Sequence, residues 1–407
     1  MGKNILIGLS GGPSAAINSS LAGVIPAAVK SPRYEKCYGA LHGIEGVLNE
    51  QFVDLAPYSD EESLAILCQT PAMAIGSCRK KLSEADYPQI DRVLEKYDIG
   101  ALFYIGGNDS MDTVEKLSRR YRELSKDIQV IGVPKTIDND LPVTDHTPGF
   151  GSAAKYLYHT MSEIIRDSEI YPVKNVVIVE VMGRDSGWLT LASAMPRFLN
   201  GGSPQIIAIP EVPFDEYGFI DRLRSLLFDE DSDVRTVICA VSEGIRDKSG
   251  NYIGMETKNG KVDTFGHAYL GGVGKYLEYL VMEKLGCKVR SIELNVLQRC
   301  AAHLASQTDL GEAFQAGVEA VHAAERGESG VTLVFKRISD EPYQVKIETT
   351  DVKQIANLTK DVPAKWWDMD NREVQTEIAR YLLPLMRGEV EPIRDETGLP
   401  VYIHIKK

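Results

Sequence analysis

The sequence predicts an α/β protein with two doubly wound, mostly parallel sheets, and three observations support this fold class. Short apolar runs alternate along the chain with longer segments whose apolar residues recur every three or four positions, as in helices. Several of the short runs are continuous in Val and Ile, which is typical of parallel strands buried on both faces. The chain has 407 residues, more than one core usually holds, so we expect two domains.

The elements are taken in chain order. The predicted strands are Ile5–Leu9, Ala101–Ile105, Gln129–Val133, Val176–Val181, Ile206–Ile209, Val237–Val241 and Val331–Phe335. The predicted helices are Asp112–Leu124, Ser152–Asp167, Glu216–Phe228, Gly274–Leu285 and Leu310–Arg326. Ser339–Asp370 loses clear periodicity and carries many charges, so we expect a loop-rich surface segment there, and Pro400–Ile405 is a candidate edge strand.

No low-complexity linker and no change in composition separates the two expected lobes. This indicates that the chain crosses between them more than once instead of through one flexible tether. We assign 1–149 together with about 298–330 to the first lobe. The second lobe receives 150–297 together with about 331–407, the end of which forms a C-terminal extension.

Charge and cysteine content limit the classes of partner. The net charge of -13 makes nucleic-acid binding through a general positive field unexpected, and no apolar run is long enough to span a bilayer. An anionic ligand would therefore need a local pocket of Lys, Arg and backbone amides. The six cysteines are scattered without a C-x-x-C pair, which argues for a reducing, cytoplasmic location and against a disulfide frame or a structural zinc site.

Two Gly-Gly turns directly follow predicted strands, where open α/β sheets bind ligands. They are Ser10-Gly11-Gly12-Pro13-Ser14 and Gly106-Gly107-Asn108-Asp109-Ser110. Glycines let backbone amides approach an anion at the N-terminus of the next helix. Each turn taken singly is equally well explained as a tight strand–helix connection, and Asp109 or Ser110 as a helix cap. Asp109 could instead help hold a magnesium ion on a polyphosphate.

The most specific segment is Lys135-Thr136-Ile137-Asp138-Asn139-Asp140, directly after the strand that ends at Val133. Carboxylates two residues apart repel each other unless a cation lies between them or one of them serves as a base. A turn rich in Asn and Asp is the plain structural alternative. Lys135 beside the carboxylates favours a site that handles anions and protons together.

Further charged residues follow other strands. Arg184 after Val181 suits the charge of a transferring phosphoryl group, although a lone arginine there is more often part of a surface ion pair. Glu243 follows Val241 and could accept hydrogen bonds from sugar hydroxyls. Arg290, Arg299 and Arg79 supply bidentate donors for phosphate. Together with the two Gly-Gly turns, this is the equipment for phosphoryl transfer.

These segments resemble the phosphofructokinase family. The matches occur in the family's order and spacing from residue 3 to about residue 335, and Thr136–Asp140 and Met182-Gly183-Arg184 are highly specific to it. The resemblance implies transfer of a phosphoryl group to the C1 hydroxyl of fructose 6-phosphate, in a cleft between two Rossmann-like lobes. It also implies Mg²⁺ as the cofactor and a homodimer or homotetramer.

The resemblance assigns roles to the matching residues. Asp138 takes the proton from the sugar hydroxyl, Thr136 and Asp140 support it, and Arg184 and Lys135 stabilise the transferring group. The implied sugar contacts are Thr136, Asp138, Asp140, Met182, Gly183, Arg184, Glu243, Arg290 and Arg299. The implied donor contacts, in the first lobe, are Gly11, Gly12, Arg79, Gly107, Asn108, Asp109, Ser110 and Lys135, with Asp109 and Asn108 as metal ligands.

Two positions predict pyrophosphate as the donor. Members of the family that use ATP carry Gly at the position of Asp109, and usually at that of Lys135, whereas pyrophosphate-using members carry Asp and Lys. A carboxylate at this position fills the space that the α-phosphate of a nucleotide would need, and its negative charge repels that phosphate. The alternatives are an ATP-dependent phosphofructokinase, a non-catalytic regulatory subunit, and a lipid or NAD kinase. The regulatory subunit should have lost Asp138 or Arg184, and the last class lacks the Lys135–Asp140 segment.

Three departures from the family pattern concern ligand binding. Asn108 stands where most relatives have Asp, and this shifts metal binding toward Asp109 and Asp140. Asn175 and Val296 replace an Arg and a His of many ATP-using relatives. We therefore expect sugar binding to involve other residues, such as Lys174.

Overall fold

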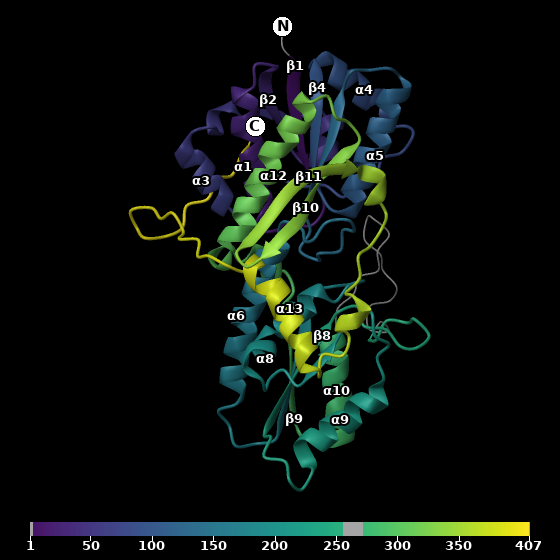
Figure 1. The fold of residues 1–407 in the computed structure, drawn as a ribbon, viewed down its shortest axis with the longest axis vertical. Coiled ribbons are helices and arrows are strands. Elements are labelled where there is room, and N and C mark those ends of the chain that lie inside the picture. Colours follow the sequence, from purple (N-terminus) through teal and green to yellow (C-terminus); the bar gives the residue numbers. More distant parts are fainter. Residues whose placement is uncertain (1–2, 255–271, 407) are drawn as a thin grey trace.

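The computed structural model describes residues 3–254 and 272–406 and has two lobes, each built on one sheet with helices on both faces (Figure 1). One sheet has seven strands and the other four. The predicted α/β fold with two doubly wound sheets is therefore confirmed, and each predicted strand lies within or overlaps an observed one. No helix in the described part of the chain combines the length and the apolar character needed to cross a membrane.

The first lobe is built on a sheet with the strand order β11-β10-β5-β4-β1-β2-β3. Its strands are β1 Lys3–Leu9, β2 Tyr34–Ala40, β3 Phe52–Asp54, β4 Ile99–Gly106, β5 Gln129–Pro134, β10 Val331–Asp340 and β11 Tyr343–Asp351. The five inner strands are parallel, and β3 and β11 run antiparallel at the two edges. All residues of β4 and β5 are buried, as expected for the centre of such a sheet.

Helices cover both faces of this sheet. They are α1 Ile17–Lys30, α2 Gly43–Leu48, α3 Glu61–Gln69, α4 Tyr87–Lys96, α5 Asn108–Glu123 and α12 Gln307–Glu325, with the 3₁₀ turns η1 Ala56–Tyr58 and η4 Val352–Gln354. One core packs α1, α3 and α12 against the sheet, and the core on the other face packs α2, α4 and α5. The amphipathic pattern of α5 and α12 explains why both were recognised in the sequence.

The second lobe contains a four-stranded, wholly parallel sheet with the order β7-β8-β6-β9. Its strands are β6 Asn175–Val181, β7 Ile206–Ala208, β8 Thr236–Ser242 and β9 Lys288–Glu293. Its helices and turns are α6 Phe150–Ser168, α7 Trp188–Ser193, α8 Met195–Asn200, α9 Glu216–Phe228, α10 Val273–Leu285, α11 Leu297–Cys300, α13 Arg372–Leu385, η3 Ala302–Leu304 and η5 Ala364–Trp366. One core lies under α6, α7, α8 and α13, and the other under α9 and α10.

The assignment of everything after 331 to the second lobe is wrong for β10 and β11. Val331 and Thr332 of β10 pair with β5, and β11 continues the same sheet. The loop-rich character expected from Ser339 onward is likewise wrong as far as Asp351. β11 alternates charged residues with Val345 and Ile347, which pack on the first-lobe core. This two-residue period of an edge strand looks like lost periodicity when only helical spacing is sought.

The chain then changes lobes twice more. Helix α13 packs in the core of the second lobe, whereas the last described residues return to the first lobe, where Ile405 is buried (Figure 1). Pro400–Ile405 does not form the expected edge strand. Only an isolated bridge joins Pro400 to Arg394, and Ile405 donates one backbone hydrogen bond to Ala74.

Candidate active site

A cavity of about 440 Å³ lies between the lobes, at the carboxyl ends of strands from both sheets. From the first sheet it receives the segments that follow β1, β4 and β5, and from the second those that follow β6 and β8. Its lining residues are Gly11, Gly12, Pro13, Arg79, Lys81, Gly107, Asn108, Asp109, Ser110, Lys135, Thr136, Ile137, Asp138, Asp140, Met182, Arg184, Asp185, Ser186, Glu243, Arg299, Asn357 and Thr359. The strand-end motifs of the sequence therefore meet in one place.

The loop after β5 carries two carboxylates into the cavity. Thr136 Oγ1 lies 3.4 Å from Asp138 Oδ2 and accepts a 3.1 Å bond from the Asp138 amide. Both carboxyl groups are half-buried at the cavity wall. This desolvation raises the pKa of Asp138 and, with the nearby Asp138 charge, the pKa of Asp140 to about 7. Between them, Asn139 has a φ of 54°, in the left-handed region. A carboxyl with a raised pKa in a cleft is suited to act as a base.

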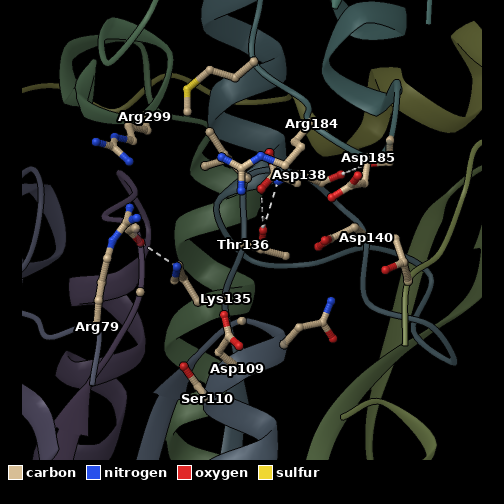
Figure 2. A pocket seen from close by; sticks show the side chains of 18 of the residues that line it. Arg79, Asp109, Ser110, Lys135, Thr136, Asp138, Asp140, Arg184, Asp185 and Arg299 are labelled. Carbon is tan, nitrogen blue, oxygen red and sulfur yellow. Dashed lines mark hydrogen bonds between the residues drawn. The ribbon is translucent and has the colours of Figure 1, made fainter. Parts of the chain in front are cut away.

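Cations gather on the opposite side of the cavity. Figure 2 shows Arg79 and Arg299 on one side, with Lys135 reaching toward them, and Asp138 and Asp140 on the other. Lys135 is buried and its Nζ donates a 2.5 Å bond to the carbonyl of Gly12. Burial lowers the pKa of Lys135 to about 8, because the charges of Asp138 and Asp140 offset only part of the lost hydration. These cations are positioned to receive an anion.

The N-terminus of α5 forms the floor of the cavity in Figure 2, where Asp109 and Ser110 lie. Asp109 forms a 3.3 Å salt bridge with Lys81. The Oδ1 atom of Asn108 is buried and has no hydrogen-bond partner among the described residues. An unpaired buried carbonyl oxygen next to a carboxylate indicates a place for a ligand, since buried oxygens normally have partners.

The second lobe contributes a cation and a carboxylate. The Nε atom of Arg184 is buried without a partner in the described part of the chain. Glu243 accepts a 3.2 Å bond from the Gly183 amide, and burial raises the pKa of Glu243 to about 7. Gly244 lies against Arg184, since a Cβ atom at Gly244 would come within 1.8 Å of the Arg184 carbonyl. The Glu243-Gly244 motif thus supports the placement of Arg184.

The cavity brings together all the site residues predicted from the sequence except Gly183, Arg290 and Lys174, and the Lys174 ammonium instead donates to the carbonyl of Leu227. Gly183 borders the site through its bond to Glu243, whereas Arg290 is exposed on β9 and does not line the cavity. The roles of all these residues stay predictions. The cavity also contains residues that the sequence reasoning did not select as site residues, namely Pro13, Lys81, Ile137, Asp185, Ser186, Asn357 and Thr359. Pro13 and Ile137 lie inside motifs already described, and Lys81, Asp185 and Ser186 lie within two residues of Arg79 or Arg184. Nothing in the sequence marked Asn357 and Thr359.

Comparisons with known proteins agree with this geometry. The family model described as phosphofructokinase matches residues 4–324. A pyrophosphate--fructose 6-phosphate 1-phosphotransferase of Xanthomonas campestris pv. campestris (strain B100) is 39% identical over 99% of this chain and 96% of that protein. Most of the lobes and the whole cavity-forming part of the first sheet therefore fall within the matched region.

Two solved structures have the same fold over almost the whole chain. A pyrophosphate-dependent phosphofructokinase from Nitrosospira multiformis superposes with a TM-score of 0.85 and 35% identity, covering 99% of this chain and 96% of that one. Another from Marinobacter aquaeolei gives a TM-score of 0.83 with 33% identity, covering 98% and 95%.

Proposed function

Because the chain belongs to the phosphofructokinase family, we propose that it transfers a phosphoryl group reversibly from pyrophosphate to the C1 hydroxyl of fructose 6-phosphate. The products are fructose 1,6-bisphosphate and phosphate. The observation that carries this proposal is that Asp109, at the start of α5, and the buried Lys135 line the same cavity. These two residues mark the donor as a short polyphosphate.

The chemistry needs a base and a set of cations. Asp138 accepts the proton of the C1 hydroxyl as its oxygen attacks the terminal phosphorus of pyrophosphate, and the bond from that phosphorus to the bridging oxygen breaks. Phosphate leaves on the first-lobe side. Arg184 from the second lobe and Lys135 from the first stabilise the charge on the transferring group from two directions.

The space beyond the second phosphate of the donor decides whether a nucleotide or pyrophosphate can bind. The Asp109 carboxylate lies on the cavity floor at the N-terminus of α5 and repels the α-phosphate of a nucleotide. Lys135, held at Gly12, supplies a cation that a two-phosphate donor can reach. The same two side chains thus exclude ATP and bind pyrophosphate.

We further propose that Mg²⁺ accompanies the donor and that Asn108 and Asp109 hold it. The described residues contain no group of three or more His, Cys, Asp or Glu side chains arranged for a metal. Magnesium is commonly held through one or two protein oxygens together with substrate phosphates. The unpartnered Oδ1 of Asn108 and the neighbouring carboxylate provide such oxygens. When bound, the ion would neutralise charge on the phosphates.

The sugar is proposed to lie on the second-lobe side. Glu243 and Met182 would contact its hydroxyls and ring, and Arg299 its phosphate. We also propose a homo-oligomer and a cytoplasmic location, the latter supported by the six cysteines, all of which are free.

The test is an assay of purified protein with fructose 6-phosphate and Mg²⁺, with pyrophosphate in one reaction and ATP in the other. We expect fructose 1,6-bisphosphate with pyrophosphate only, and none from the matched variant Asp138→Asn. Turnover with ATP alone would contradict the roles of Asp109 and Lys135. Activity with neither donor would favour a non-catalytic subunit.

A further inference from the structure

A short segment after β11 forms one wall of the cavity. The chain passes there from the first lobe to the second (Figure 1). Asn357 and Thr359 line the cavity, and Asn357 Nδ2 donates a 3.0 Å bond to Asp112 of α5. On the other side, the amide of Val362 donates a 2.9 Å bond to Glu211 of the second lobe. The segment is therefore fixed to both lobes beside the reacting groups.

Lys360 lies at the centre of this segment. Its backbone amide, its carbonyl and its side-chain ammonium all form hydrogen bonds. Its amide donates a 2.7 Å bond to the carbonyl of Asp140, and its carbonyl accepts a 3.0 Å bond from the indole nitrogen of Trp188. Its ammonium donates to Asn139 Oδ1 at 3.3 Å, to the Thr144 carbonyl at 3.2 Å and to the Asp145 carbonyl at 2.9 Å. An ammonium has three protons to donate, and here three oxygens lie within reach.

This arrangement is unfavourable for stability alone. All three acceptors are neutral oxygens, the Trp188 ring centroid lies 5.0 Å from the ammonium, and no salt bridge to Lys360 occurs within the described residues. Burial lowers the pKa of Lys360 to about 8, and the charged or titratable groups that face it are Asp140, Asp145 and Arg337, with Tyr381 beside them. Desolvating a cation without a contacting counterion costs free energy that an apolar side chain of similar length would not incur.

The group that Lys360 holds is the loop that carries the base. Asn139 is fully buried, with its side chain bound by Lys360 at one end and by the Tyr381 hydroxyl, 2.9 Å away, at the other. Its left-handed backbone sets the directions of the preceding and following carboxylates, Asp138 and Asp140. Releasing Asn139 would free both carboxylates to turn.

We propose that Lys360 is a positioning residue of the active site, whose ammonium holds the 136–145 loop so that Asp138 points at the sugar hydroxyl. The inference rests on the proposed function. It assigns the segment after β11 a part in the reaction, in addition to connecting the lobes. The cation also acts through space on Asp140, favouring its ionised form.

The test compares Lys360→Met, Lys360→Gln and Lys360→Arg with a matched control, Lys365→Met. Lys365 belongs to the same segment but forms an exposed 2.7 Å salt bridge with Glu377. We expect Lys360→Met to lower kcat about 30-fold or more, since small misplacements of reacting groups have such effects, with KM for fructose 6-phosphate within about threefold of wild type. The acid limb of the pH–rate profile of this variant should move to higher pH by about half a pH unit or more, because the variant lacks a cation near Asp140.

The other two substitutions distinguish the effect of the Lys360 charge from the effect of its packing. Lys360→Arg should keep the acid limb in place, whereas Lys360→Gln, which retains donors but no charge, should shift it as Lys360→Met does. Unchanged kcat and an unmoved acid limb in Lys360→Met would overturn the proposal. So would failure of both neutral variants to fold, because it would show that the residue is needed for stability.

Hydrogen exchange makes the result independent of the proposed function. Faster exchange in 136–145 of Lys360→Met, with the rest of the protein unchanged, supports the inference, and unaltered exchange there overturns it. If the wild-type protein turned over neither donor, the proposed function would be wrong, and this measurement would still decide the role of Lys360.

Discussion

Two clusters of buried charge each contain residues of the 135–146 segment, and they differ in how their charges are paired. In the first, His146 lies 2.8 Å from Asp145 and 2.6 Å from Glu312, and Arg337 completes it at 3.0 Å from Asp145. The second contains Lys135, Asp138, Asp140 and, across the cleft, Glu243. Among the described residues, no salt bridge involves any member of the second cluster.

The two clusters shift pKa values in opposite senses. Burial opposes the charge of His146, but its hydrogen bonds to Asp145 and Glu312 outweigh burial and raise its pKa to about 9. In the second cluster burial prevails, so the pKa of Lys135 falls to about 8 and that of Asp140 rises to about 7. Paired ions are thus stabilised as ions and contribute to folding. The unpaired groups have no salt-bridge partner within residues 3–254 and 272–406, so a bound ligand can supply one. Such groups are characteristic of a functional site.

The largest expected effect follows from removing the base. Asp138→Asn should lower kcat about 1,000-fold or more, because general-base catalysis is lost. Its thermal stability should equal or exceed that of wild type, since the change removes a desolvated carboxyl group that has no salt-bridge partner. Steady-state kinetics and a melting curve measure the two effects. A clear loss of stability would show that Asp138 is part of the folded framework and would contradict the contrast between the clusters.

The sequence was informative about the second cluster and silent about the first. Lys135, Asp138 and Asp140 follow a continuous apolar strand, so the sheet rule predicted their place at its carboxyl end. The pairing of His146 with Glu312, and of Asp145 with Arg337, depends on α12 and β10 meeting the 144–146 loop, and no local pattern encodes such a meeting. Asn357 and Thr359 escaped notice for the same reason, since their segment reaches the cavity only because β10 and β11 extend the first sheet.

The paired cluster gives the second largest effect, on stability. His146→Gln should lower the free energy of unfolding by about 3 kcal/mol at pH 6, because Asp145 and Glu312 lose a cation between them. The His146 pKa is higher in the folded state than the usual 6.5, so this stabilisation is present in full below pH 6.5 and is lost as pH rises through about 9.

Urea unfolding at pH 6 and pH 9 therefore checks both the size and the sign of this effect. The difference between wild type and His146→Gln should shrink at the higher pH, and kcat of the variant should stay within about threefold of wild type. A difference that grows with pH would mean that His146 is neutral in the folded protein. His322→Gln is the control, because His322 is exposed on α12.

The next largest expected effect is on the choice between pyrophosphate and ATP as the donor. The double variant Asp109→Gly with Lys135→Gly should lower the ratio of kcat/KM for pyrophosphate to that for ATP about 100-fold or more, since one preorganised cation accounts for an effect of that order. Kinetics with both donors at fixed Mg²⁺ measures the ratio. Lys81→Met is the control, because its exposed salt bridge to Asp109 should change the ratio only slightly. An unchanged ratio in the double variant would remove these residues from donor selection.

The smallest expected effect is the pH dependence of the wild-type reaction, to which the unpaired cluster contributes both an acid and an alkaline limb. Since kcat/KM for pyrophosphate reports the free enzyme, it should rise with pH as the Asp138–Asp140 pair ionises, with Asp140 near 7, and fall as Lys135 loses its proton near 8. The profile is then a narrow bell that falls about tenfold per pH unit on each side. Lys135→Arg should remove the alkaline limb, because a guanidinium stays charged, whatever it does to the maximum. An alkaline limb that persists in this variant would belong to another group, and the unpaired lysine would then not be the cation that meets the donor.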